Sequence, residues 1–247
     1  MNEVDIAIAR EKIGASLSSW VASPDMTYAL RKGSWFFFSG IPSPAVNMAM
    51  VSDDEGALLD DILNSISENR VPAVLFLASE GKNLSGRLPT EWRKLGLFTF
   101  MAKDLSNKFT ELDKRVSLAS ADDAESVLQL LEEAFTVESG TYQFLFGASQ
   151  DPRSALNIWV LKVDGVVVST VTTILVGDAL SIWCMATPQR FERRGYGKAL
   201  LGHVVARSKA NGAKIGLLSA TPAGKPLYFD SGWESLEEWD VYLTAAE

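Results

Sequence analysis

The sequence is poor in the residues that most often bind metals or catalyse covalently. Among its 247 residues it has a single cysteine, Cys184, and a single histidine, His203. One cysteine cannot form an internal disulfide, which fits a reducing compartment such as the cytoplasm. One Cys and one His do not favour a metal site, so we predict none. We also expect neither a membrane span, because no apolar run reaches the ~18 residues needed, nor a secretory signal, because the first residues are acidic.

The chain also lacks positive charge. It has 23 Lys and Arg against 31 Asp and Glu, which gives a formal net charge of −8. Such an excess of carboxylates repels a phosphate backbone, so nucleic acid is not an expected partner, whereas a cationic amine would be attracted. The hydrophobic fraction of 47% and the charged fraction of 22% are those of a globular protein. The length allows one large domain or two of ordinary size.

The segment from Leu180 to Leu201 is the most informative one. An apolar strand, Leu180–Thr187, is followed by a basic, glycine-containing turn and then by a helix over Ala199–Ala210. A helix N-terminus offers free N–H groups and a positive dipole end, and glycine lets an anion approach the amides closely. The pattern therefore predicts an anion site, with added charge from the flanking Arg and Lys side chains.

Two motifs in this half of the chain resemble those of the GNAT superfamily of acyl-CoA-dependent N-acyltransferases. Residues 194–199, Arg-Gly-Tyr-Gly-Lys-Ala, match the second half of the pyrophosphate loop pattern Gln/Arg-x-x-Gly-x-Gly/Ala. In the first half Glu192 stands where Gln or Arg is expected, and Arg193 is adjacent. Downstream, Leu227-Tyr228 and Gly232-Trp233 resemble the family segment Leu-Tyr-x-x-x-Gly-Phe, with Trp in place of Phe.

This resemblance implies a fold, a co-substrate and a reaction. The fold would be mixed α/β, with a largely antiparallel sheet flanked by helices. Acetyl-CoA would donate an acetyl group to a primary amine by direct transfer in a ternary complex. Tyr228 would be the acid that protonates the leaving thiolate, and the backbone N–H of Met185 or of Ala186 would stabilise the oxyanion. Glu138 is the candidate base, with Asp178 as the other carboxylate near in chain order. The residues expected to bind the co-substrate are Cys184, Met185, Ala186, Thr187, Arg193, Arg194, Gly195, Tyr196, Gly197, Lys198, Ala199 and Thr221.

We predict a helix over Glu55–Asn69, with an apolar stripe and Asp53 as its cap, and a short helix over Pro89–Leu95. In the second half, Ser120 and Asp123 are close to a capping box for a helix over Ala124–Phe135, and strands are expected over Leu156–Val163 and Val166–Val176.

The order of predicted elements occurs twice, which indicates two GNAT-like copies in tandem. We predict a degenerate first copy over residues 1–112 and an acetyl-CoA-binding catalytic copy over residues 113–247, with a linker near Asp104–Arg115. Where the second copy has its basic loop, the first has Ser52-Asp53-Asp54-Glu55-Gly56. Carboxylates at a helix N-terminus would repel a diphosphate, so the first copy is not expected to bind coenzyme A.

Some alternatives stay open. The absence of a carboxylate on the strand before the loop, together with Glu192, favours a non-catalytic acyl-CoA-binding or sensing protein, whereas Tyr228 favours catalysis. Cys184 could relay an acyl group, but a small apolar strand residue is the preferred interpretation. The aromatic run Trp35–Phe38 is expected in a buried strand rather than in a platform for bases. The acceptor is not readable from the sequence, and a monomer and a homodimer are both compatible with it.

Overall fold

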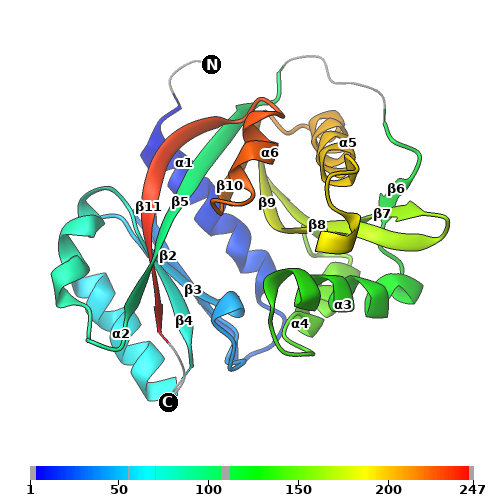
Figure 1. Ribbon diagram of the computed structural model, residues 1–247. Coiled ribbons are helices and arrows are strands. Elements are labelled where there is room, and N and C mark those ends of the chain that lie inside the picture. Colours follow the sequence, from blue (N-terminus) through cyan, green and yellow to red (C-terminus); the bar gives the residue numbers. More distant parts are fainter. Residues whose placement is uncertain (1–3, 55, 70, 107–111, 245–247) are drawn as a thin grey trace. The chain divides into compact units, whose positions relative to one another are not determined.

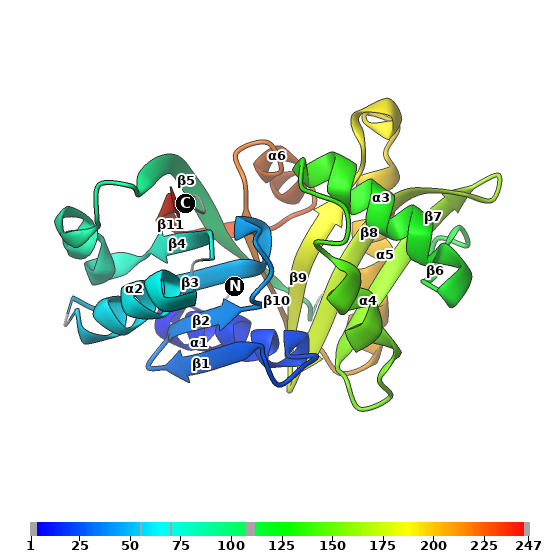
Figure 2. The same cartoon turned by 90° about the horizontal axis from the view of Figure 1, so that it is seen from below.

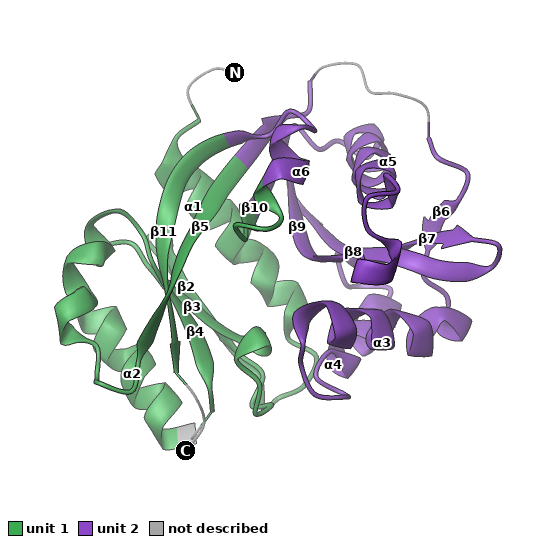
Figure 3. Cartoon of the chain, in the orientation of Figure 1, with its two compact units in different colours: residues 1–101, 219–225, 235–247 green, residues 102–218, 226–234 purple. Residues whose placement is uncertain are grey.

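The computed structural model describes residues 4–54, 56–69, 71–106 and 112–244 (Figure 1). The chain forms two compact units that are not contiguous in sequence (Figure 3). Unit 1 comprises residues 1–101, 219–225 and 235–247, and unit 2 comprises residues 102–218 and 226–234. The chain passes between the units four times, after Met101, Leu218, Lys225 and Glu234. Part of the predicted linker, residues 107–111, lies outside the described residues.

Unit 1 holds a sheet with the strand order β1-β2-β3-β4-β11-β5. Its β3 and β4 are parallel and are joined by α2, whereas the pairs β1/β2, β2/β3 and β4/β11 are antiparallel. The elements are α1 (Ile6–Ser16), η1 (Leu17–Trp20), β1 (Thr27–Arg31), β2 (Ser34–Phe38), η2 (Pro44–Val46), β3 (Asn47–Val51), α2 (Ala57–Asn69), β4 (Ala73–Leu77), η3 (Ser79–Arg87), β5 (Arg93–Asp104, which enters unit 2 after Met101) and β11 (Glu234–Thr244, in unit 1 from Ser235).

Aromatic and aliphatic side chains fill the core of unit 1. The predicted apolar stripe of α2 packs on β3 and β4, with Leu59 and Ile62 fully buried. The run in β2 is buried as expected, since Trp35, Phe37 and Phe38 are at most 4% exposed. The buried strand is thus confirmed for these aromatics. In β11, the ring of Trp239 stacks on Phe100 with centroids 4.7 Å apart.

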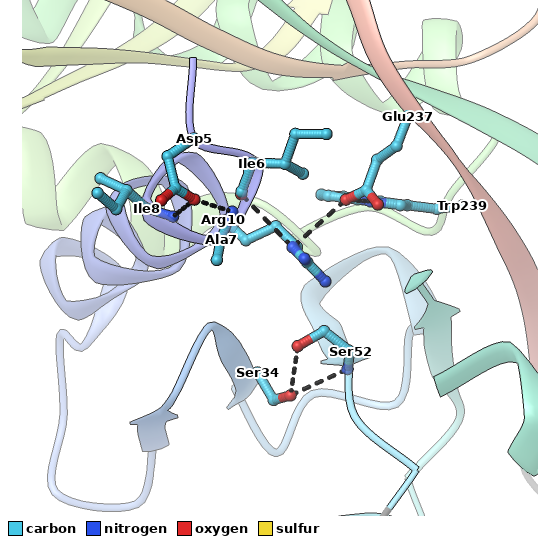
Figure 4. Close-up of polar contacts among 9 residues, drawn as sticks. All are labelled: Asp5, Ile6, Ala7, Ile8, Arg10, Ser34, Ser52, Glu237 and Trp239. Atoms are coloured by element: carbon cyan, nitrogen blue, oxygen red, sulfur yellow. Dashed lines mark hydrogen bonds and ion pairs between the residues drawn. The ribbon is translucent and has the colours of Figure 1, made fainter. Parts of the chain in front are cut away.

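A buried ion pair joins the first helix of unit 1 to the last strand (Figure 4). The Arg10 Nε atom lies 3.5 Å from Glu237 Oε1, and both side chains are largely buried. Glu237 also accepts a hydrogen bond of 2.7 Å from Trp239 Nε1. Removing one member would leave a buried charge uncompensated, which is strongly destabilising. Nearby, the Ser34 hydroxyl accepts a 3.0 Å hydrogen bond from the Ser52 N–H and so links the ends of β2 and β3.

Unit 2 holds the strand order β10-β9-β8-β7-β6. Strands β9 and β10 are parallel and are joined by α5, and the other neighbouring pairs are antiparallel. Helices α5 and α3 cover opposite faces of this sheet (Figures 1 and 2). The elements are β6 (Val116–Leu118), η4 (Ala121–Asp123), α3 (Ala124–Phe135), α4 (Gln143–Gln150), β7 (Leu156–Val163), β8 (Val166–Val176), β9 (Ala179–Ala186), η5 (Gln189–Phe191), α5 (Tyr196–Ala210), β10 (Ile215–Ala220, in unit 2 up to Leu218) and α6 (Lys225–Phe229).

The mixed α/β class with a largely antiparallel sheet is confirmed, and so is the capping box formed by Ser120 and Asp123. Three local predictions are wrong. The helix expected over Pro89–Leu95 is absent, because the chain there enters the long strand β5 and tertiary pairing overrides local propensity. Helix α5 begins at Tyr196 rather than Ala199. Asp53 does not cap α2, because Gly56, with φ +76°, lies between the acidic loop and the helix.

Gly216 in β10 provides a test of how tightly unit 2 is packed around the site. A Cβ atom at Gly216 would lie 2.7 Å from Trp233 Cη2, whereas a Cβ atom at Gly202, on the exposed face of α5, meets nothing within 4 Å. We expect Gly216→Ala to destabilise the protein by about 1–3 kcal/mol through overpacking. Gly202→Ala should stabilise it by about 0.5–1 kcal/mol. Thermal unfolding followed by circular dichroism measures both, and equal shifts would contradict the proposed contact.

Candidate active site

The second half of β9 is separated from the regular pairing of the sheet. Cα partners join β10 to β9 only from Ile215/Ala179 to Leu217/Ser181, although β9 continues to Ala186. On its other side, the register with β8 shifts between the pairs Thr172/Trp183 and Thr170/Ala186. Cys184 sits at this bulge in the left-handed region, with φ +44°. A bulge bends a strand and re-aims its backbone groups, so this stretch can offer them to a ligand.

The basic loop after β9 leads directly into α5. Gly195 is the N-cap residue, with φ +79°, a left-handed conformation that favours glycine. Arg193 is also left-handed, with φ +59°. Arg193, Arg194 and Lys198 are exposed, so their cationic groups are available beside the first turn of the 15-residue helix. Free amides, the positive end of the dipole and full charges thus lie together, as predicted for an anion site.

Gly197 marks the point where β9, α5 and α6 converge. A Cβ atom placed on Gly197 would lie 3.4 Å from Thr187 Oγ1 and 3.5 Å from both Met185 Cε and Leu227 Cδ2. Unlike Gly195, this glycine has no positive φ, so we attribute its use to space rather than to backbone conformation. The structure therefore brings together residues from the loop, the strand end and the segment that carries Tyr228.

The end of β9 is fixed by a serine of β8 that the sequence reasoning missed. The Ser169 hydroxyl is buried, donates a 3.0 Å hydrogen bond to the Ala186 carbonyl and lies 2.8 Å from Thr187 Oγ1. The sequence does not distinguish Ser169 from the three threonines of the same strand, Thr170, Thr172 and Thr173. Ser169 thus holds the strand end where the chain turns into the loop.

Tyr228 lies on α6 and is almost entirely buried. It is 8% exposed, and its ring packs edge-to-face on Trp233 with centroids 5.9 Å apart. Burial raises the pKa of the Tyr228 phenol above its ordinary value of ~10. The hydroxyl therefore stays protonated throughout the neutral range and can act as a proton donor.

Cys184 has a protonated thiol rather than a reactive thiolate. The residue keeps part of its surface open, but burial of the thiol raises its pKa to about 12. Burial also raises the pKa of Tyr142, and Cys184 makes a smaller contribution to this increase. The sequence analysis did not identify this buried phenol near the strand. His203 packs instead on Trp159, 5.6 Å between ring centroids, and burial lowers its pKa. No hydrogen bond joins His203 to Cys184 among the described residues, so the geometry does not support an acyl relay.

Two predicted site residues are not brought into this cluster. Glu138 is exposed between α3 and α4, where its backbone carbonyl accepts a 2.7 Å hydrogen bond from Thr141 Oγ1. Thr221 belongs to unit 1, where its hydroxyl accepts a 3.1 Å hydrogen bond from the Gly224 N–H. Within the ranges that the structure describes, no group of three or more His, Cys, Asp and Glu side chains could hold a metal ion.

A further cation lies beside the loop. The Arg115 guanidinium lies over the Tyr196 ring, 5.9 Å from its centroid, and donates hydrogen bonds of 3.0 and 2.6 Å to Asp113. This hydrogen-bonded pairing lowers the pKa of Asp113 to about 2. The spacing Asp-x-Arg is visible in the sequence, but its proximity to Tyr196 depends on the tertiary structure.

One family model matches part of the chain. Residues 124–228, somewhat under half of the chain, match the model of the acetyltransferase (GNAT) family. The match spans α3 to Tyr228 and so includes the loop and the strand end. None of the curated proteins matches the chain.

Solved structures resemble nearly the whole chain. The GCN5-related N-acetyltransferase from Kribbella flavida has a TM-score of 0.66 at 16% identity, over 97% of this chain and 96% of that one. The GCN5-related N-acetyltransferase from Sphaerobacter thermophilus gives 0.59 at 16% identity, over 96% and 91%. A functionally unknown conserved protein from Staphylococcus epidermidis gives 0.60 at 12% identity, over 91% and 96%. At these identities the likeness shows the fold alone. Among the helices described, none combines the length and the apolar character needed to span a bilayer.

The raised pKa of Cys184 predicts slow thiol chemistry in the folded protein. In mildly alkaline buffer, we expect the native thiol to react with a disulfide reagent at least tenfold more slowly than in urea, where its pKa returns to ~8.5. Absorbance of the released chromophore gives both rates. Cys184→Ala should also retain acetyl transfer. A native thiol as reactive as the unfolded one would contradict this assignment.

Proposed function

We propose that this protein is a GNAT-type N-acetyltransferase that moves an acetyl group from acetyl-CoA to a primary amine. The convergence at Gly197 supports the proposal, because a cationic helix N-terminus, a strand end without a Cα partner in β10 and the Tyr228 segment lie around one point. The residues fit the co-substrate: the loop suits its diphosphate, and the extended pantetheine arm suits a strand edge without a Cα partner in β10.

The proposed chemistry is direct transfer in a ternary complex. Acetyl-CoA supplies an activated acyl group as a thioester. The loop amides with Arg193, Arg194 and Lys198 bind and orient its diphosphate. The backbone N–H of Met185, beside the bulge, is the proposed donor to the carbonyl oxygen as negative charge develops there. The amine nitrogen bonds to the acetyl carbon, the bond between that carbon and sulfur then breaks, and Tyr228 gives its proton to the departing sulfur. The proton that the nitrogen loses as the amide forms restores the Tyr228 phenol.

The acceptor amine must reach the reaction as a neutral nucleophile. Its ordinary pKa is ~10.4 if it is an alkylamine, so a proton has to be removed before attack. Glu138 stays the proposed base, with exposure to solvent as its route for releasing the proton. The class of acceptor proposed is a small molecule or peptide that carries a primary amine.

We further propose that the chain consists of two GNAT-like copies in tandem, 1–112 and 113–247. In unit 1 a parallel pair, β3 and β4, is joined by α2, and in unit 2 a parallel pair, β9 and β10, is joined by α5. Only the second pair has a basic loop between its first strand and its helix, whereas Asp53 and Asp54 precede α2. The proposed role of the first copy is therefore structural.

Charge in the loop provides the first test. Arg194→Gln should weaken binding of coenzyme A roughly three- to tenfold in calorimetry at low salt, because a charge-assisted contact to phosphate is lost. High salt should reduce this difference. The matched control is Arg153→Gln, an exposed arginine of unit 2 that is paired with Asp151 before β7. If calorimetry detects no heat of binding between the wild-type protein and coenzyme A, the proposed function is overturned.

Tyr228 provides the second test. Tyr228→Phe keeps the buried ring but removes the proton donor, so kcat should fall roughly 10²- to 10⁴-fold while the Kd of acetyl-CoA stays unchanged. Release of free thiol over a panel of amines measures turnover. If the wild-type protein binds acetyl-CoA and turns over no amine, it is instead an acyl-CoA-binding or sensing protein.

A further inference from the structure

The segment that carries Tyr228 is too short to hold itself in place. Helix α6 has five residues, and helices of this length are not stable on their own. Its end is a tight turn in which the N–H groups of Ser231 and Trp233 each donate a 3.0 Å hydrogen bond to the Tyr228 carbonyl. Gly232 completes the turn with φ +76°. The carbonyls of the turn itself then need other donors.

Lys103 supplies that donor. Its Nζ atom donates a 2.5 Å hydrogen bond to the Ser231 carbonyl and lies 3.4 Å from the Gly232 carbonyl. A Cβ atom at Gly232 would lie 2.9 Å from Nζ, so the ammonium group sits directly against the turn. Cations are favoured at carbonyls near a helix C-terminus. Burial lowers the pKa of Lys103, with an opposing contribution from Glu234.

The backbone around Lys103 is itself anchored in unit 2. Lys103 is part of the end of β5, which belongs to unit 2 from residue 102 onward. Two residues later, the Leu105 N–H donates a 2.9 Å hydrogen bond to the Lys214 carbonyl, just before β10. The ammonium group is therefore presented from a strand rather than from an unanchored loop.

We propose that Lys103 is a positioning residue for Tyr228, contributed to the catalytic unit by the first half of the chain. By holding the Ser231 and Gly232 carbonyls, Lys103 fixes the turn whose N–H groups bind the Tyr228 carbonyl, and thus the direction in which the phenol points. This inference rests on the proposed function, since it assigns Lys103 to the same reaction. It also gives the first copy a direct part in the site.

The test compares two lysines that both donate to backbone carbonyls of unit 2. Lys103→Met removes the donor at the turn. Lys209→Met is the matched control, because Lys209 Nζ donates a 2.6 Å hydrogen bond to a different backbone carbonyl, that of Ser106. Hydrogen exchange of a peptide covering residues 228–233 should be roughly tenfold faster in Lys103→Met and unchanged in Lys209→Met. This measurement needs no activity.

Kinetic measurements test whether Lys103 acts through Tyr228. Lys103→Met should lower kcat roughly ten- to a hundredfold with the Kd of acetyl-CoA unchanged, because small misplacements of a catalytic group are costly. In the Tyr228→Phe background, the same change should have no further effect on kcat. A merely structural lysine would give additive losses instead.

The outcomes separate this inference from the proposed function. Unchanged exchange in Lys103→Met, or additive losses in the double variant, would overturn the role of Lys103 while wild-type turnover upholds the enzyme. If hydrogen exchange is faster in Lys103→Met but the wild-type protein shows no turnover, the proposed function is overturned. That result supports only the contact by which Lys103 stabilises the turn after Tyr228. Faster exchange with a non-additive kinetic loss supports both.

Discussion

The site depends on one departure from regular pairing, at the carboxyl end of β9. On one side, the Cα register with β10 stops at Ser181, and on the other a bulge at Cys184 shifts the register with β8. A strand within a regular sheet has its backbone hydrogen bonds satisfied by both neighbours. Here the stretch beyond Ser181 has no Cα partner in β10, and beyond Trp183 its register with β8 is shifted. Its backbone groups on the β10 side are therefore the ones proposed to bind an extended ligand, and Ser169 keeps the strand end in place.

Two different electrostatic environments lie beside this strand end, one charged and exposed and the other buried. The chain is acidic overall, yet three exposed cationic residues, Arg193, Arg194 and Lys198, lie at the N-terminus of α5, where partial and full positive charges act together. Tyr228 lies in the opposite environment, buried against Trp233, and this desolvation keeps its phenol protonated. Positive charge and a retained proton are the two properties that the proposed acetyl transfer uses.

The ends of two strands make the halves of the chain interdependent. Strand β11 comes last in the sequence, yet it pairs with β4 in unit 1 and is linked to α1 through Arg10 and Glu237. Conversely, the end of β5 contributes Lys103 to unit 2, against the turn that follows Tyr228. The first part of the chain therefore contributes to unit 2, because it supplies a strand end and a cation there.

The sequence by itself determined the elements whose signals are local. Alternation and turn residues placed β7 and β8 at their observed bounds, the motif around Gly195 placed the loop before a helix, and Ser120 predicted a capping box. Only the tertiary structure decided the bulge at Cys184, the exchange of strand ends and the contact of Lys103 with the Tyr228 turn. These features arise from pairing between segments far apart in the chain, and a strand carries no local signal of which neighbour it will join.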